Sequence, residues 1–445
     1  MPPNAKPTVR SAAKVSARLP SSTRRRFVHQ LGAGLGTSLA AGAVAEAAVP
    51  TAPAPAPNPP PAPAPPPVFN LTAVGSLLPF IQSQAVKKDF PLSYLQPQFQ
   101  DVPAWKKKAR GKLLDLLHYS PPACAPRAEV VERVDLGDHV REKIYFNTTP
   151  DVRLPAYLLI PKQARLPAPT IIALHDHGGF YLWGKEKLTE NADEHPVLTD
   201  FKKTFYGGRS IATDLVRQGY VVIVIDMFYW GERRLLLDDD AADWRERPRT
   251  IAPERIRLFN QRSGQSEYLV GRTILAAGFT WSGVMFWDDV RTVDYLLTRK
   301  EVDPQRIGCV GLSIGGLRAC HLAALDDRIK AAVVVGWMAS FPRQLQRHVR
   351  SAIGFTKLVP GLYRYLDYPD VAALAMPAAL LVINGTKDGL FDQPGVRESY
   401  EKLTACYQKA GVLEKFRGQH YDTPHEFNTE MQTEAWAWLR KWVVG

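Results

Sequence analysis

Residues 307–319 read Ile-Gly-Cys-Val-Gly-Leu-Ser-Ile-Gly-Gly-Leu-Arg-Ala. An apolar run of strand length ends at Gly311, Ser313 follows at the turn, and a helix-like segment opens at Gly315. Gly-x-Ser-x-Gly alone would match by chance about 0.15 times in a chain of this length, at roughly 7% usage of each residue type. Its setting makes it informative, because a strand-turn-helix unit holds a serine hydroxyl at a helix N-terminus.

Apolar runs and helix-length segments alternate around this stretch. Residues 130–136, 140–146 and 154–160 predict strands separated by polar turns. Further strands are predicted at 170–174, 220–225, 307–311, 331–335 and 378–383, and helices at 211–218, 286–298, 315–325, 396–410 and 426–442. Runs without polar alternation are typical of strands buried on both faces of a parallel sheet. The sequence therefore predicts an α/β fold, with an antiparallel start and a mostly parallel central sheet flanked by helices.

Two connections are too long for simple loops, at 178–208 and 227–280. Long loops in compact domains usually cover a site or lack order. Both leave the carboxyl ends of predicted strands, where open α/β sheets bind ligands. We therefore expect lid-like insertions at this edge of the sheet.

The elbow serine needs a base, and the base needs an orienting acid. In this architecture the chain order is serine, acid, histidine. Asp388, just after the strand 378–383, is the preferred acid, although Asp also caps turns, and Asp392 is the alternative. Only His420 and His425 lie downstream of Asp388. A last strand is expected to end near residue 420. His425, which follows this strand, is the preferred base, and His420, at its end, is the alternative.

The loop after the strand 170–174 reads His-Asp-His-Gly-Gly at 175–179. An oxyanion needs two backbone donors. We expect one from the amide of Ile314, directly after the serine, and one from His177, or from Gly178 if the register differs by one. Three consecutive residues have poor geometry for binding one metal ion, and no partner ligand stands out elsewhere, so no metal site is predicted.

Residues from about 130 to 445 resemble the α/β-hydrolase superfamily, and most of all its dienelactone hydrolase and acetyl xylan esterase-like branch. The resemblance is carried by residues 174–179, 287–296, 302–308, the elbow and 384–388. It implies the α/β-hydrolase fold and a triad of Ser313, Asp388 and His425. Dienelactone hydrolases proper use a cysteine nucleophile, so the serine at this position favours an esterase. Cys309 and Cys320 flank the elbow on the predicted strand and helix, and are interpreted as core residues.

The residues and the resemblance together predict a serine hydrolase that cleaves carboxylic esters through an acyl-enzyme and needs no cofactor. Acetylated carbohydrate is the first substrate class expected. One alternative is a peptidase of the prolyl-oligopeptidase type, although no segment reads as the repeats of its propeller. The other is a non-catalytic carbohydrate-binding protein on a hydrolase fold, which the ordered Ser, Asp and His argue against.

Aromatic and basic side chains near the strand ends are candidates for substrate contact. The aromatic candidates are Trp183, Phe228, Tyr229, Trp230, Trp281 and Trp337, for each of which core or lid packing is the commoner role. Arg233 and Arg234 are candidates for binding a substrate carboxylate. The alternative is that they pair with the nearby acidic residues 238–240.

The N-terminal region carries most of the chain's charge imbalance. The net charge is +12, and residues 1–45 hold seven basic residues and no acidic one, which leaves +5 for the remainder. Thr-Arg-Arg-Arg-Phe-Val at 23–28, an apolar stretch and Ala-Val-Ala at 43–45 resemble a twin-arginine signal peptide. Residues 46–68 are a Pro/Ala-rich linker, 69–128 an expected helical extension, and 129–445 the expected catalytic domain.

This division predicts where the protein works and what it meets. It is expected to use the twin-arginine export machinery and to be periplasmic or secreted. No apolar run reaches the ~18 residues of a membrane-spanning helix, so no stable membrane insertion is expected. The cations at 106–112 lie at helical spacing and are interpreted as a solvated face rather than a nucleic-acid site. The expected substrate is a small-molecule or carbohydrate ester.

Overall fold

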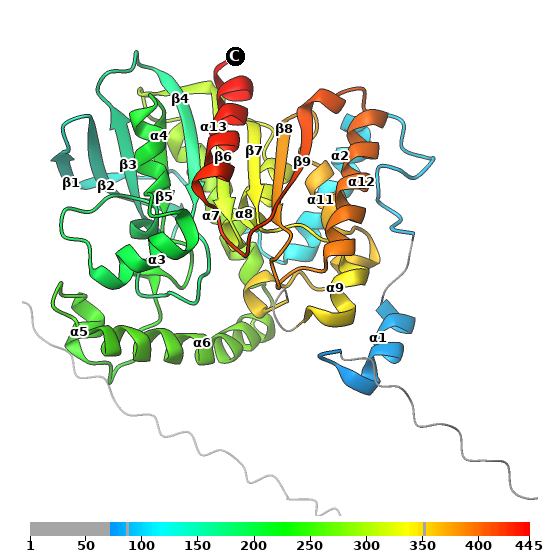
Figure 1. Ribbon diagram of the computed structural model, residues 1–445, viewed down its shortest axis with the longest axis horizontal. Helices are drawn as coiled ribbons and strands as arrows, with labels where there is room; N and C mark the ends of the chain where they lie inside the picture. Colours follow the sequence, from blue (N-terminus) through cyan, green and yellow to red (C-terminus); the bar gives the residue numbers. More distant parts are fainter. Residues whose placement is uncertain (1–71, 86–88, 350–352) are drawn as a thin grey trace, which may run out of the picture. The chain divides into compact units, whose positions relative to one another are not determined.

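The computed structural model describes residues 72–85, 89–349 and 353–445. The predicted signal peptide and linker lie outside the described residues. Within those residues, nine strands form one sheet (Figure 1). The strands are β1 (Glu129–Asp135), β2 (His139–Thr149), β3 (Val152–Pro161), β4 (Ala168–Leu174), β5 (Val221–Ile225), β6 (Val302–Leu312), β7 (Ile329–Val335), β8 (Ala379–Gly385) and β9 (Phe416–Tyr421).

The sheet has an antiparallel start and a parallel body. Its strand order is β1-β2-β3-β5-β4-β6-β7-β8-β9, with antiparallel pairing from β1 to β5 and parallel pairing from β5 to β9. All residues of β5 and β8 are buried, as expected for strands covered on both faces. The predicted α/β architecture and its strands are confirmed, with boundary differences of a few residues.

Helices pack on both faces of the sheet. Figure 1 shows α4 and α13 in front of it and α7 and α8 behind it. The helices are α1 (Leu78–Ala85), α2 (Val102–Leu117), α3 (Pro196–Tyr206), α4 (Ile211–Arg217), α5 (Ala242–Glu246), α6 (Pro253–Ala276), α7 (Trp281–Leu296), α8 (Ile314–Leu325), α9 (Phe341–Arg347), α11 (Tyr368–Ala373), α12 (Gln393–Lys409) and α13 (Thr429–Leu439). Parallel crossovers of this kind bring the carboxyl ends of β4 to β9 to one edge.

The two long connections contain helices that the sequence pattern did not indicate. The connection 178–208 holds α3, and 227–280 holds α5 and the 24-residue α6. The last helix begins at Thr429 rather than at 426, because Asn428 caps it by accepting a hydrogen bond from the Met431 amide. His425 therefore lies in the loop between β9 and α13.

Helix α2 is part of the main core. Trp105 and Leu113 are wholly buried in the same hydrophobic cluster as the central strands. The interpretation of its cations as a solvated face is only partly right, since Lys106 is buried and its Nζ lies 2.6 Å from Oδ1 of Asp327. Arg110 binds the same carboxylate. This pairing ties α2 to the turn between α8 and β7.

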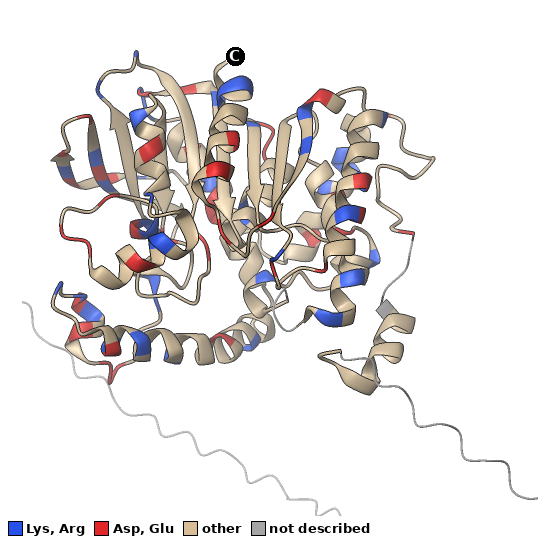
Figure 2. Ribbon diagram, viewed as in Figure 1, with Lys and Arg blue, Asp and Glu red and all other residues tan. Residues whose placement is uncertain are grey.

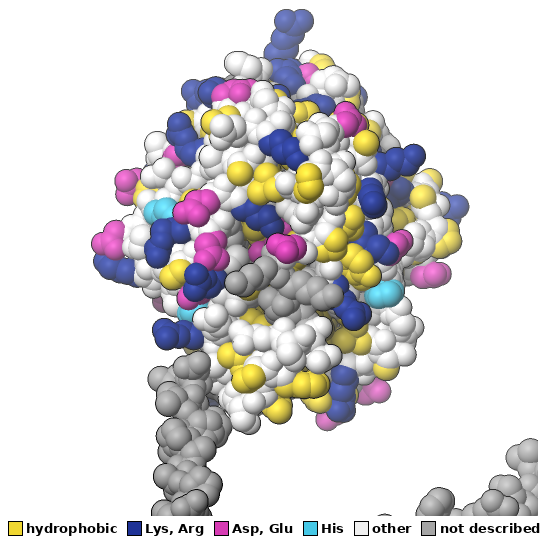
Figure 3. Space-filling model, turned by 90° about the vertical axis from the view of Figure 1, so that its right-hand side faces the viewer, with side chains coloured by type: hydrophobic (Ala, Val, Ile, Leu, Met, Phe, Trp, Pro, Cys, Tyr) yellow, Lys and Arg dark blue, Asp and Glu magenta, His cyan; other side chains and the backbone are white. Residues whose placement is uncertain are grey.

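Charges of both signs are interspersed over the described elements (Figure 2). On the face that Figure 3 shows, basic, acidic and apolar side chains are intermingled. Within the described ranges no single helix is long and apolar enough to cross a membrane. The bent pair α6 and α7, taken together, is long and apolar enough, by length and composition only.

Candidate active site

Ser313 occupies a strained turn between β6 and α8. Its backbone has φ 60° and ψ −120°, which is unfavourable for a residue with a side chain. Two glycines make the turn possible: a Cβ on Gly311 would overlap the backbone of Gly315, and a Cβ on Gly315 would overlap the carbonyl oxygen of Leu174. The Ser313 amide donates to the Val335 carbonyl at 2.8 Å, which fixes the turn against the end of β7.

Asp388 and His425 form a hydrogen-bonded pair. Nδ1 of His425 lies 2.6 Å from Oδ2 of Asp388, and the Leu390 amide donates to the other carboxylate oxygen at 2.9 Å. The Asp388 side chain is 1% exposed and that of His425 is 18% exposed. The buried carboxylate therefore holds the proton of His425 on Nδ1, which leaves Nε2 as the nitrogen that can accept a proton.

The serine and the histidine converge on the same turn. Gly336 follows Val335, the residue that binds the Ser313 amide, and donates to the Ile383 carbonyl at 2.8 Å. A Cβ on Gly336 would lie 3.0 Å from Cε1 of His425. The loops after β8 and β9 thus join Asp388 to His425, and the turn after β7 lies next to both His425 and the backbone of Ser313.

The two alternative residues serve other roles. The ring of His420 packs on Tyr400 with centroids 4.7 Å apart, and burial lowers the pKa of His420. Asp392 caps α12, with its carboxylate accepting from the Gly395 amide at 2.9 Å. Neither makes the contact that joins Asp388 to His425. Burial also raises the pKa of Cys320 to about 12, which is unsuited to a thiolate nucleophile.

The loop after β4 lies against the elbow. The steric fit of Gly315 under Leu174 places this loop beside the N-terminus of α8, where Ile314 begins the helix. Gly178 and Gly179 have φ of 55° and 62° and are exposed, a conformation that glycine adopts without strain. The amide of Ile314 thus belongs to one segment, and those of His177 and Gly178 to another. The two segments meet where Gly315 packs against Leu174.

The polar side chains of this loop are engaged by protein groups. His175 is wholly buried; its Nε2 accepts from the Met227 amide at 3.1 Å and its Nδ1 lies 2.9 Å from the Asp176 carbonyl. Burial holds the pKa of His175 well below its usual value, so the ring is neutral. Among the described residues, no group of three or more His, Cys, Asp or Glu is placed to hold a metal ion.

A contact between the loop and α6 was not foreseen from the sequence. Nε2 of His177 lies 2.8 Å from Oε1 of Glu267, and the Tyr181 hydroxyl donates to the same oxygen at 2.9 Å. Burial opposes ionisation of Glu267, but its interactions with His177, Tyr181 and Lys357 together outweigh burial and lower the pKa of Glu267. Helix α6 is thus hydrogen-bonded, through Glu267, to the loop that carries the candidate oxyanion donors.

The candidate substrate-binding side chains are mostly occupied in packing. Trp183, Tyr229, Trp230, Trp281 and Trp337 are buried, and Phe228 is half-buried. Arg233 pairs with Asp288 at 2.7 Å, and Arg234 donates to the carbonyls of Gly231 and Trp244. The alternative that the arginines pair with residues 238–240 is wrong, because Asp288 on α7 and backbone carbonyls accept from them instead.

Comparisons with known proteins identify similar sequences and folds. Residues 80–245 match the model of an Abhydrolase family, and residues 203–420 match that of the dienelactone hydrolase family. A curated relative, described as "Putative hydrolase YtaP" of Bacillus subtilis (strain 168), is 28% identical over 343 residues, which span 76% of this chain and 100% of the relative.

Two solved structures share the fold at low identity. One, a "putative acetyl xylan esterase" from Bacteroides fragilis, aligns with a TM-score of 0.57 and 16% identity over 79% of this chain and 82% of its own. The other, a glucuronoyl esterase from Solibacter usitatus, aligns with a TM-score of 0.56 and 16% identity over 80% of this chain and 98% of its own. The chain therefore has the α/β-hydrolase fold, and the family matches support a place in its dienelactone hydrolase-like branch.

Proposed function

We propose that this protein is an exported serine hydrolase that cleaves carboxylic esters. The observation that carries the proposal is the contact between His425 and the buried Asp388, together with a serine in a strained elbow that is bonded to the same turn on which His425 lies. A base oriented by a buried acid and placed next to a hydroxyl is the arrangement that activates serine. The match to the dienelactone hydrolase family and the likeness to two structures named as esterases support the same reaction class.

The proposed reaction has two halves. In the first, Nε2 of His425 takes the proton of the Ser313 hydroxyl while Oγ attacks the ester carbonyl carbon. The tetrahedral oxyanion is bound by the amide of Ile314 and that of His177 or Gly178. When the carbon–oxygen ester bond breaks, His425 returns the proton to the leaving alcohol. In the second half, His425 activates water, which attacks the acyl-enzyme and releases the acid and free Ser313.

The proposed substrate is an acetylated carbohydrate, and the proposed location is the periplasm or the exterior after twin-arginine export. The substrate proposal is supported by the name of one structural neighbour, an acetyl xylan esterase. The export proposal is supported by the arginine run and the small-residue pattern within residues 1–45. No cofactor takes part in the proposed steps.

Acetate release from acetylated xylo-oligosaccharides tests the proposed function. The wild type should release acetate, and His425→Ala should reduce kcat by at least about 10³-fold, because the base is part of the acting unit. His420→Ala is the matched control, since that ring packs on Tyr400, and it should retain activity. Equal losses in the two variants, or acetate release that survives His425→Ala, would contradict the assignment.

A further inference from the structure

A buried cation lies directly beneath the loop after β4. Lys187 ends the short turn η2 (Lys185–Lys187), and its side chain is wholly buried. Its Nζ donates to the carbonyl of Asp176 at 2.9 Å and to that of His177 at 3.1 Å. The nearest carboxylate oxygen, Oδ2 of Asp176, is 3.6 Å away. The ammonium group is thus bound mainly by two consecutive backbone carbonyls.

These carbonyls belong to the two peptide units whose amides are candidate oxyanion donors. The Asp176 carbonyl shares a peptide plane with the His177 amide, and the His177 carbonyl shares one with the Gly178 amide. In a trans peptide the C=O and N–H groups point in opposite directions. Lys187 binds both carbonyls from the protein interior. The two N–H groups therefore point the other way, toward the exposed side on which Gly178 lies.

Each carbonyl also receives hydrogen bonds from other groups. Nδ1 of His175 donates to the Asp176 carbonyl at 2.9 Å, and the His177 carbonyl accepts from Nε1 of Trp230 and from the Phe180 amide, both at 3.2 Å. Hydrogen bonds to a carbonyl polarise the amide and make its N–H a better donor, most of all when the binding group is charged and buried. Lys187 supplies the only full charge among these four donors, because His175, the Trp230 indole and the Phe180 amide are neutral.

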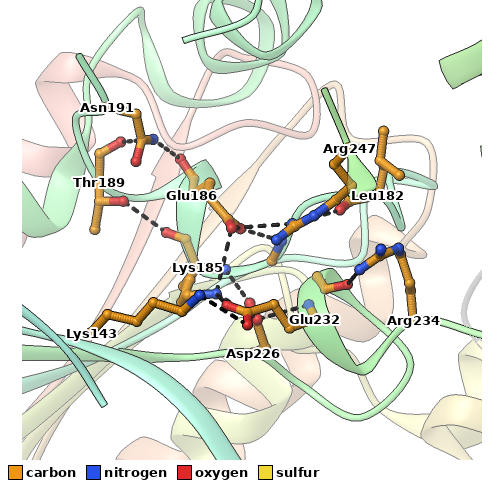
Figure 4. A network of polar contacts seen from close by, with 12 residues as sticks. Lys143, Leu182, Lys185, Glu186, Thr189, Asn191, Asp226, Glu232, Arg234 and Arg247 are labelled. Atoms are coloured by element: carbon orange, nitrogen blue, oxygen red, sulfur yellow. Dashed lines mark hydrogen bonds and ion pairs between the residues drawn. The ribbon is translucent and has the colours of Figure 1, made fainter. Parts of the chain in front are cut away.

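The turn that carries Lys187 is anchored rigidly. Figure 4 shows its first residue, Lys185, among Asp226, Glu186 and Glu232, with Arg247 on the far side of Glu186. Nζ of Lys185 lies 2.8 Å from Oδ2 of Asp226, and its amide donates to Oδ1 at 2.7 Å. These contacts hold η2 against the loop after β5. They thereby fix the position from which Lys187 reaches the carbonyls of Asp176 and His177.

The two buried lysines of this turn differ in how far nearby carboxylates compensate for the burial of their charge. Coulombic attraction to Asp226, Glu186 and Glu232 keeps the pKa of Lys185 above its usual value although burial opposes it. Burial lowers the pKa of Lys187 to about 8, so its attraction to carboxylates does not offset desolvation. A buried charge with so little compensation is costly for folding. Its contact with the candidate donor peptides gives that cost a functional reason.

We propose that Lys187 is a positioning residue that aims and polarises the backbone amides of His177 and Gly178 toward the developing oxyanion. This inference rests on the proposed function, since it concerns the same site. Because the oxyanion forms only in the transition state, removal of the cation should lower kcat and leave KM nearly unchanged.

Lys187→Met and a matched control test the inference. Lys202, on α3 of the same insertion, is also buried, and its Nζ donates to the Thr189 carbonyl at 2.7 Å and to Ser210, away from the donor peptides. Removing one oxyanion donor outright costs roughly 10²–10³ in kcat, so misaiming donors that remain should cost about 10- to 100-fold. For an aryl acetate, Lys187→Met should show this loss in kcat, and Lys202→Met should not, even where both melt at lower temperatures.

The pH profile gives a readout that needs no destabilised variant. The groups that face Lys187 are His175 and Asp176 after β4, Asp226 after β5, Glu186 on its own turn and the ring of Phe201 on α3. As the pH rises through about 8, Lys187 loses its proton and the amides lose the charge behind them. Wild-type kcat should fall above pH 8, and Lys187→Arg, which stays charged, should lose that decline.

The outcomes separate this inference from the proposed function. Equal kcat losses in Lys187→Met and Lys202→Met, a loss confined to KM, or a wild-type kcat that is flat from pH 7 to 10 would overturn the role of Lys187 while leaving the triad intact. A wild type that neither hydrolyses aryl acetate nor reacts with a serine-directed phosphonate would overturn the proposed function, and this inference with it.

Discussion

Replacing Asp388 by Asn probes the contact on which the proposed mechanism depends. The carboxylate accepts from Nδ1 of His425 at 2.6 Å and from the Leu390 amide at 2.9 Å. An Asn side chain of nearly equal size can keep its oxygen on the Leu390 amide, but its NH₂ then faces Nδ1. Nδ1 must become an acceptor, the ring proton moves to Nε2, and the base can no longer take the proton of Ser313.

The magnitude follows from the loss of the correct tautomer. Such a change in a serine triad costs roughly 10⁴-fold in kcat, so we expect a loss of about 10³- to 10⁴-fold, or about 4 to 5.5 kcal/mol of transition-state stabilisation. The assay is the kcat for hydrolysis of an aryl acetate, with the melting temperature measured on the same sample. KM should change little, because the carboxylate does not contact the substrate in this account.

Asp392→Asn is the matched control. It replaces a second Asp of the same loop by the same residue, and Asn caps helices about as well as Asp does. The cap on the Gly395 amide should survive, and kcat should stay near the wild-type value. The reasoning is refuted if Asp388→Asn keeps kcat within tenfold of wild type, or if Asp392→Asn loses as much.

Three further predictions concern the frame of the site. Gly315→Ala should abolish phosphonate labelling and lower the melting temperature, because its Cβ would overlap the carbonyl of Leu174. Arg318→Met should cost about 3–5 kcal/mol in urea unfolding, since it leaves the buried Asp289, now bound at 2.6 Å, without its partner. Burial raises the pKa of Asp367 to about 7 from 3.8, so the folded chain binds more protons than the unfolded chain between these values. This residue's contribution to stability should therefore fall as the pH rises from about 4 to 7, and Asp367→Asn should remove that slope from urea unfolding measured across this range.

Matched controls accompany the Gly315 and Arg318 variants, and each of the three predictions has a result that would contradict it. Gly389→Ala, at a position where an added Cβ meets nothing within 4 Å, should be tolerated. Arg417→Met removes the more exposed pair with Glu434 and should cost under about 1 kcal/mol. A fully labelled Gly315→Ala, equal costs for the two arginine variants, or an unchanged pH slope in Asp367→Asn would each contradict the corresponding argument.

The parts of the site foreseen from the sequence are those set by local structure and chain order. The elbow is a local unit, because its glycines, its strand and its helix are adjacent in sequence. Asp388 and His425 follow from the order of residues after the strands β8 and β9. Their contact spans 37 positions, but the parallel topology leaves few places where an acid and a histidine can meet.

The parts that were missed depend on contacts between insertions. Helix α6 buries only three large apolar side chains along its 24 residues, Ile256, Phe259 and Ile274, so few apolar positions mark it in the sequence. Glu267 on that helix reaches His177 across 90 positions, and Arg233 prefers Asp288 across 55 positions to the acidic residues nearby. Lys187 reads as an ordinary surface lysine in sequence. Only the fold of the insertion places it beneath the loop, because no local pattern specifies which carbonyls a long side chain will reach.

Mapping of a covalent adduct tests the central claim most directly. The folded wild-type protein is treated with an active-site phosphonate, digested, and the modified peptide located by mass spectrometry. We expect one adduct per chain on Ser313, abolished in Ser313→Ala and retained in Ser399→Ala, whose hydroxyl donates to the Gly395 carbonyl. An absent adduct, or one that persists in Ser313→Ala, would contradict the account.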